Sequence, residues 1–188
     1  MTLRQMTFVI LTGCCLAMAN CESKESGPSG PQPAVKENNS NSEIIITTVY
    51  AIRELQTTSG DESTALSETG ELQGESLNFY FSKKDLNNVF AEDNIGCQQS
   101  AEYAAGAKGL TVREPIEELN ANFARQVTTT YKGQSLLVIG KTGSLPTFFQ
   151  NLGYPQIFNI RDSEYGQMYK LEIDNDGEIT FLKEVFHQ

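Results

Sequence analysis

The sequence has almost no histidine: His187, next to the C-terminal residue, is the only one among 188 residues, and tryptophan is absent. A reaction that needs an imidazole as its nucleophile therefore has one candidate side chain. Cysteine is also scarce, because three of the four cysteines precede residue 22 and only Cys97 lies in the part expected to fold. One cysteine excludes an internal disulfide and a cysteine zinc cluster. We expect Cys97 to be inert and half-buried rather than a reactive thiol.

Basic residues are few as well. Lysine and arginine number 14 against 24 aspartates and glutamates, which gives a net charge of -10 and a pI of about 4.6. Such a chain has no general attraction for nucleic acid or for anionic lipid. The composition therefore predicts no nucleic-acid partner, and the length is sufficient for one domain with its own core.

The one long apolar run near the N-terminus predicts export. Arg4 precedes the apolar, small-residue-rich stretch 6–19, which has the length of a signal peptide and is too short to span a bilayer. The stretch ends at Cys21, an arrangement typical of a bacterial lipoprotein signal over residues 1–20. Cys14 is an alternative acylation site, with better lipobox-like residues before it but a shorter apolar core. We favour Cys21, and secretion without a lipid is a further alternative.

Residues 21–42 are polar and rich in Pro, Gly, Ser and Glu, with almost no apolar side chains. Such a segment cannot bury enough apolar surface to become ordered and is predicted to be a flexible linker. The folded domain is expected at 43–188. Together these features predict an exported protein of the cell envelope, attached to a membrane by lipid.

Two apolar runs predict the centre of a sheet. The segment 44–54 is β-branched and apolar until it changes to charge at Arg53 and Glu54, and 134–139 is a second such run. Runs of this kind indicate strands buried on both faces, as in a parallel sheet. Sites in open α/β sheets lie beyond the carboxyl ends of such strands, which makes Arg53 and Glu54 candidate site residues.

The remaining chain alternates between helical and extended patterns and ends in a hairpin pattern. This order predicts a three-layer α/β/α sandwich with a mostly parallel central sheet. The expected elements are a helix that starts at Ser67 as N-cap, a short strand at 89–91, a helix over 98–108 stopped by Gly109, a helix that starts at Pro115, a helix that runs through Phe148 to Gly153, and a hairpin of 167–173 with 178–186.

Two motifs are rejected. Gly140-Lys141-Thr142 lacks the first glycine of a P-loop, since position 135 is Ser135 and the intervening residues belong to a strand. The segment 174–177 lacks the final bidentate glutamate of a calcium loop, where Lys183 stands instead. The sequence therefore predicts no metal and no cofactor, and 174–177 is interpreted as a turn.

Four segments, in order, resemble the histidine phosphatase superfamily, the phosphoglycerate mutase-like fold. They are Thr48-Val49-Tyr50-Ala51-Ile52-Arg53-Glu54, which resembles the first strand and its Arg-His pair; Leu66-Ser67-Glu68-Thr69-Gly70-Glu71-Leu72-Gln73, which resembles the following helix start; 89–101, which resembles the segment of the second phosphate-binding arginine; and 136–146, which resembles the strand of the second histidine. The resemblance covers about residues 47 to 185 and implies the family's fold.

The departures fall on the residues that carry the family's chemistry. Arg53 is retained, whereas Glu54 and Lys141 stand where the resemblance implies the two histidines, and Gly96 stands where it implies the second arginine. The family's phosphatase reaction needs an imidazole that attacks phosphorus. The resemblance therefore implies a non-catalytic binding or scaffold domain. The alternative is a hydrolase with altered chemistry, in which Glu54 is the nucleophile or general base.

The same positions carry the ligand predictions. Arg53 and Lys141 are the candidate ligand-binding residues, and an anionic small molecule or an envelope protein is the candidate partner. Since the resemblance places Glu54 and Lys141 opposite each other, we expect them to form an ion pair across the former phosphate site, with Arg53 as a second cation on the same carboxylate.

Overall fold

The computed structural model describes residues 43–59, 64–156 and 159–187. The predicted signal peptide and linker, with Cys14 and Cys21, lie outside the described residues. Residues 42–188 make up one compact unit. Its elements are β1 (Thr47–Arg53), α1 (Glu68–Ser82), β2 (Asn88–Ala91), α2 (Ile95–Lys108), α3 (Ala121–Thr129), β3 (Ser135–Gly140), α4 (Ser144–Asn151), β4 (Gln167–Ile173) and β5 (Ile179–Val185).

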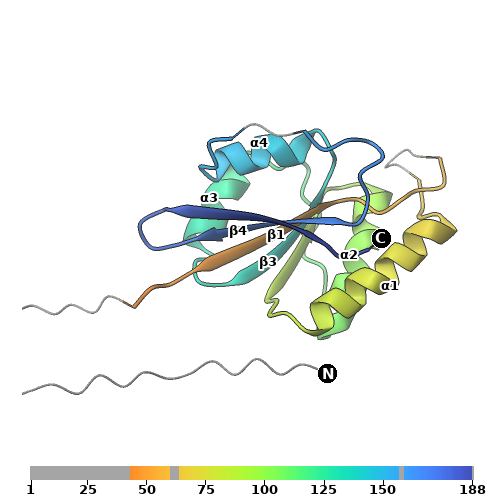
Figure 1. The fold of residues 1–188 in the computed structure, drawn as a ribbon, viewed down its shortest axis with the longest axis horizontal. Coiled ribbons are helices and arrows are strands. Elements are labelled where there is room, and N and C mark those ends of the chain that lie inside the picture. The colour runs from red at the N-terminus through yellow and green to blue at the C-terminus, as the bar shows by residue number, and fades with distance from the viewer. Residues whose placement is uncertain (1–42, 60–63, 157–158, 188) are drawn as a thin grey trace, which may run out of the picture. The chain divides into compact units, whose positions relative to one another are not determined.

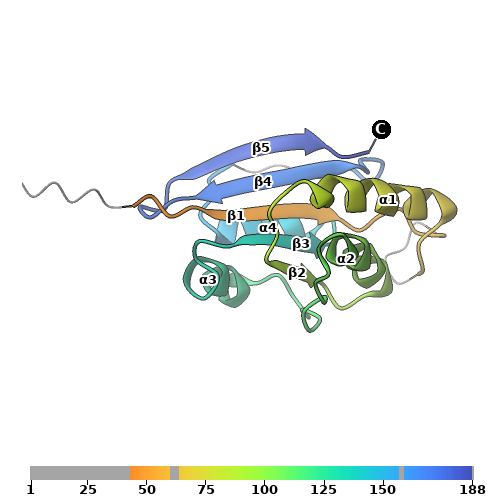
Figure 2. The same ribbon diagram turned by 90° about the horizontal axis from the view of Figure 1, so that it is seen from below.

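The five strands of the described residues form one sheet in the order β2-β3-β1-β4-β5, which Figure 2 shows from one edge to the other. β2, β3 and β1 run parallel, whereas β4 is antiparallel to β1 and β5 is antiparallel to β4. The prediction of a mostly parallel sheet was therefore wrong in this detail. The C-terminal hairpin joins the sheet through β4, which runs antiparallel to the first strand, and the tight turn makes its own β4–β5 pair antiparallel.

α3 and α4 cover one face of the sheet and α1 and α2 cover the other, which confirms the predicted three layers (Figure 1). Alternate side chains of the central strands point to opposite faces. Val49 and Ala51 pack with Phe123 of α3 and Phe148 of α4. The neighbouring strand residues pack on the other face with apolar residues of α1 and α2, among them Tyr50, Ile52, Leu77, Phe81 and Ala101. Because both faces are covered, the central strands are apolar almost throughout.

Helix ends follow their capping residues. Ser67 caps α1 as predicted and accepts a hydrogen bond from the Gly70 amide, and Gly109 ends α2 in the left-handed conformation. Asn94 caps α2 and starts it earlier than expected. The helix predicted at Pro115 was wrong, because α3 begins only after its N-cap Asn120. Residue 116 instead forms a bridge to residue 92. Asparagine side chains, not the proline, satisfy the first free amides.

The first strand is shorter than its apolar run. β1 starts at Thr47, and Ile44, Ile45 and Ile46 precede it with exposures of 74%, 42% and 45%. The residues of the strand itself are buried almost without exception, as the sequence predicts. The turn at 174–177 joins β4 to β5, which confirms the hairpin. Among the described residues no helix is long and apolar enough to cross a membrane.

Candidate functional site

The ends of β1 and β3 bring two of the predicted site residues to neighbouring positions. In the parallel register Arg53 lies opposite Gly140, so Glu54 and Lys141 are the next residues along the two strands. This confirms that the two charged residues leave adjacent strands at the carboxyl edge of the sheet. The family-like motifs on the two apolar runs therefore meet in space.

The third position, Gly96, lies in the first turn of α2 and is buried. Its carbonyl accepts a hydrogen bond of 2.6 Å from the Ser100 hydroxyl, and that hydroxyl accepts one of 2.9 Å from the Leu55 amide. The start of α2 is thus attached to the residue that follows Glu54. Glycine adds no side chain there, so this helix start contributes no cation to the site.

Arg53 is buried, with 6% of its surface exposed, and most of its donors already have partners. Nη1 donates to the carbonyls of Arg161 at 3.3 Å and Asp162 at 2.7 Å. Nη2 donates to Glu54 Oε1 and, at 3.3 Å, to the Tyr165 hydroxyl. Nε has no hydrogen-bond partner among the residues the structure describes. Four of the five N–H groups that a guanidinium offers are therefore used within the protein.

The partners of Arg53 come from its neighbour in sequence and from one distant segment, residues 161–165. Glu54 forms a buried ion pair with it and is itself 4% exposed. The guanidinium also lies 4.1 Å from the centre of the Tyr165 ring, a cation–π geometry. Glu164 pairs with Lys183 of β5, and this hydrogen bond holds the pKa of Glu164 below its ordinary value. The segment 161–165 is thus fastened to the hairpin and covers the guanidinium.

Lys141 lies in the turn after β3, and its backbone shows which group organises that turn. Its amide donates to Glu92 Oε2 at 2.6 Å, and the same oxygen accepts a bond of 2.6 Å from the Ser144 hydroxyl. Glu54 forms an ion pair with Arg53, which the sequence predicted as the second cation on this carboxylate. The predicted pairing of Glu54 with Lys141 stays a prediction.

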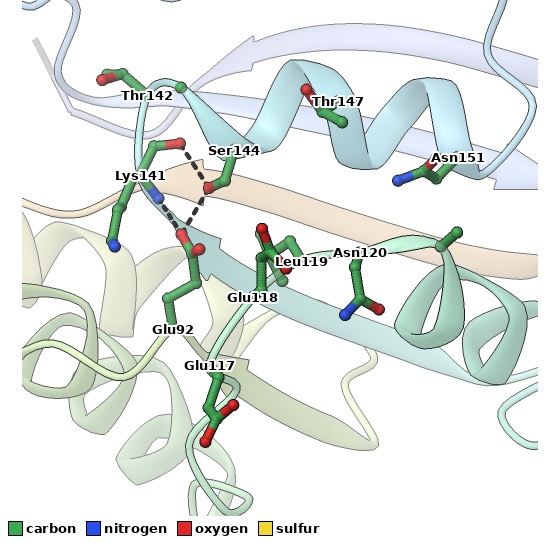
Figure 3. Close-up of a pocket in the computed structure, with 12 residues that line it drawn as sticks. Glu92, Glu117, Glu118, Leu119, Asn120, Lys141, Thr142, Ser144, Thr147 and Asn151 are labelled. Carbon is green, nitrogen blue, oxygen red and sulfur yellow. Dashed lines mark hydrogen bonds between the residues drawn. The ribbon is translucent and has the colours of Figure 1, made fainter.

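A cavity of about 820 Å³ opens beside this turn, between the start of α3 and the length of α4 (Figure 3). Lys141, Ser144 and the 2%-exposed Glu92 line one part of it. Arg53, Glu54 and Gly96 do not line this cavity. Of the four predicted site positions, Lys141 is the one that lines it.

Other candidate chemical groups of the sequence are placed elsewhere. Cys97 is fully buried, more than the half-burial expected, and Asn94 Nδ2 donates to its sulfur at 3.2 Å. His187 Nδ1 lies 2.9 Å from the Ser76 hydroxyl on α1 and is not among the partners of Arg53. Within the described ranges no cluster of His, Cys, Asp and Glu could hold a metal ion.

No protein-family model matches the sequence, and no curated protein matches it. Solved structures do match. The protein histidine phosphatase SixA, in complex with tungstate, is 14% identical over 74% of this chain and 97% of its own, with a TM-score of 0.52. Phosphoglycerate mutase from Bacillus anthracis is 11% identical over 74% and 92%, with a TM-score of 0.57. A mycobacterial glucosyl-3-phosphoglycerate phosphatase is 12% identical over 74% and 98%, also with a TM-score of 0.57.

The chain has a phosphoglycerate mutase-like fold, the fold of these three solved structures. At these identities the likeness concerns the fold, and the chemistry has to be argued from the site itself. Three elements that carry family-like motifs meet at the carboxyl edge of the sheet in this phosphoglycerate mutase-like fold, namely the ends of β1 and β3 and the start of α2.

Sequence reasoning missed two participants of this site. Tyr165 stacks on Arg53 although 112 positions separate them, and no local pattern marks that contact. Glu92 directly follows the expected strand 89–91 and received no role from the sequence, yet its carboxylate holds the Lys141 turn. A signal for Glu92 existed in principle, because a charged residue directly after a buried strand is a site candidate in an open α/β sheet.

Proposed function

We propose that this protein is an exported, lipid-anchored component of the cell envelope, and that its histidine phosphatase-like domain is a non-catalytic binding or scaffold domain. The burial and pairing of Arg53 carry the non-catalytic part of the proposal, whereas export and lipid anchoring rest on the sequence of residues 1–21. The guanidinium of Arg53 is buried, paired with Glu54, and bonded to the segment 161–165. An arginine used in this way stabilises the domain from within instead of presenting a fork of donors to a phosphate.

Electrostatics support the same conclusion. A phosphate that reached Arg53 would have to compete with the Glu54 carboxylate for the same nitrogen. Two unit negative charges about 4 Å apart repel each other by roughly 4 kcal/mol at the intermediate dielectric of a protein surface. The carbonyls of Arg161 and Asp162, which also accept from Arg53, add negative dipoles to this environment. The surroundings of Arg53 therefore disfavour phosphate, the anion that the resemblance to histidine phosphatases implies at this position.

The side chains at the two resembled histidine positions also support a non-catalytic domain. A phosphohistidine intermediate needs a neutral imidazole in line with the phosphorus atom. The side chains at the two resembled histidine positions are a carboxylate, Glu54, and an ammonium group, Lys141. The one imidazole of the chain, His187, is held by Ser76 of α1.

We expect the protein without residues 1–21 to hydrolyse p-nitrophenyl phosphate no faster than buffer and to form no phospho-enzyme. A catalytically competent phosphatase of the same fold, assayed in parallel, is the positive control. Acid-labile phosphate trapped on the protein during turnover would refute the proposal. Turnover of phosphate or carboxylic esters that disappears in Glu54→Gln would instead establish the altered hydrolase.

We expect the combined substitution Cys14→Ser and Cys21→Ser to move the protein from the membrane fraction to the soluble fraction of its native host. The physical reason is that acyl chains supply the membrane affinity, and a single chain binds only marginally, so the mature anchor should carry more than one. Cys97→Ser is the matched control, because this cysteine is buried in the domain and should leave the distribution unchanged. Sedimentation of the double variant with membranes would contradict lipid anchoring.

A further inference from the structure

The cavity between the start of α3 and the length of α4 has the size of a ligand site. Its volume of about 820 Å³ lies within the range of small-molecule pockets, roughly 300–1,000 Å³. It is separate from the buried Arg53–Glu54 pair, neither of which lines it. A ligand could therefore occupy it without breaking that pair.

The cavity is acidic at one end. Glu92, Glu117 and Glu118 line it together with one cation, Lys141, which gives a formal charge of -2. The N-termini of α3 and α4 also face it, and each contributes about +0.5 of an elementary charge. The sum is still negative. The lining therefore favours a cation over the phosphate esters that the resembled family would bind.

Glu92 is the buried carboxylate of this acidic end. Its Oε2 is occupied by the Lys141 amide and the Ser144 hydroxyl, which fixes the side chain in one orientation. Gly140 makes room for it, because a Cβ at that position would lie 3.0 Å from the same oxygen and 2.5 Å from Leu119. A fixed, desolvated carboxylate attracts a cation more strongly than a solvated one does.

The other end of the cavity is neutral and polar. Asn120, Thr147 and Asn151 line it, and Figure 3 shows them along α4 and the start of α3, away from Lys141. Amide and hydroxyl side chains donate and accept hydrogen bonds, so they suit the hydroxyl groups of a ligand. No aromatic side chain is among the lining residues, so a flat hydrophobic ligand would find no stacking partner.

From these two ends we infer that the cavity binds a small polar molecule that carries a primary ammonium group beside hydroxyl groups, as an amino sugar does. The ammonium group would lie at Glu92 and Glu118 and the hydroxyl groups at Asn120, Thr147 and Asn151. This inference deepens the proposed binding role, but it is independent of whether the domain has phosphatase activity.

The test is a titration of isotope-labelled protein without residues 1–21, followed by NMR at pH 6.5, with three probes of similar size. That chain keeps the whole described domain, which has its own core. Glucosamine carries the ammonium group, N-acetylglucosamine has it blocked, and glucose 6-phosphate is an anion. We expect glucosamine to shift the signals of cavity residues and to bind at least tenfold more tightly than either other probe. Equal binding of N-acetylglucosamine, preference for glucose 6-phosphate, or no shift at the cavity would overturn the inference.

Variants with opposite expected effects on glucosamine affinity distinguish an effect on binding from an effect on folding. The double substitution Glu117→Gln and Glu118→Gln lies on an exposed loop and should weaken glucosamine binding about tenfold, because two attractive charges are lost. Lys141→Gln removes the one cation of the lining and should strengthen binding about threefold. Glu178→Gln, in the distant hairpin turn, is the matched control and should change nothing. Affinities that fall in both cavity variants, or in neither, would refute the electrostatic assignment.

Discussion

Replacement of Arg53 by methionine is expected to lower the free energy of unfolding of the domain by about 3–5 kcal/mol. The two side chains of the Arg53–Glu54 pair are 7% and 5% exposed. Methionine fills much of the same volume but leaves the Glu54 carboxylate without its buried counter-charge. It also removes the donor from the carbonyls of Arg161 and Asp162. Chemical denaturation of the wild type and the variant, followed by far-UV circular dichroism, measures the difference.

Two further variants identify the cause. Arg161→Met makes the same substitution on a side chain that is 82% exposed, so we expect a change within about 0.5 kcal/mol. The double variant Arg53→Met, Glu54→Leu removes both buried charges and should lose less stability than the sum of the two single variants. A loss below about 1 kcal/mol for Arg53→Met, or strict additivity in the double variant, would show that the pair does not stabilise the domain from within.

Gly70→Ala is expected to destabilise the domain by about 2–3 kcal/mol, although alanine is the better helix former. Gly70 lies in the first turn of α1, and a Cβ there would lie 2.0 Å from the backbone oxygen of Gln56. That oxygen accepts hydrogen bonds from the amide and the hydroxyl of Ser67, so it cannot move without breaking them. The clash therefore outweighs the gain in helix propensity, which is about 1 kcal/mol.

Gly106→Ala is the matched control for this prediction. Gly106 lies inside α2, and the nearest atom to an added Cβ is Asn78 Nδ2 at 3.8 Å, an ordinary contact. Because the added Cβ meets no clash, the higher helix propensity of alanine should stabilise the domain by about 0.5–1 kcal/mol. The two glycine variants should thus change the midpoint of urea unfolding in opposite directions. A stabilised Gly70→Ala variant would contradict the close approach of α1 to residue 56.

The Gly70 contact also explains why a family-like motif was visible in the sequence. The pattern from Leu66 to Gln73 combines the N-cap Ser67 with a glycine that lets the helix approach the segment after β1. Gln73 completes it by accepting a hydrogen bond of 2.9 Å from the Gln56 amide through its side chain. Short motifs of this kind can be recognised in a sequence because local geometry requires particular residue types at fixed spacing.

Several predictions failed where contacts with distant residues decide the outcome. The apolar side chains Ile44 to Ile46 continue the strand pattern, yet the neighbouring strands pair only from Thr47 onward. The helix predicted at Pro115 is displaced to Ala121, because residues 112 and 116 bridge to β2 and to Glu92 and so keep the chain extended. In both cases the local preference was reasonable and tertiary pairing overrode it.

The sequence by itself determined the order of strands and helices, the burial of the two central strands, the hairpin, and the positions of Arg53, Glu54 and Lys141 at strand ends. These features follow from periodicity and capping, which are local properties. Only the tertiary structure decided that the segment 161–165 closes over Arg53 and that Glu92 faces the cavity beside Lys141. The chain separations of these contacts, 109 positions for Arg53 with Asp162 and 49 for Glu92 with Lys141, lie far outside any local pattern. Such contacts form because packing of the whole sheet and its helices places the segments together, and no short stretch of sequence encodes that arrangement.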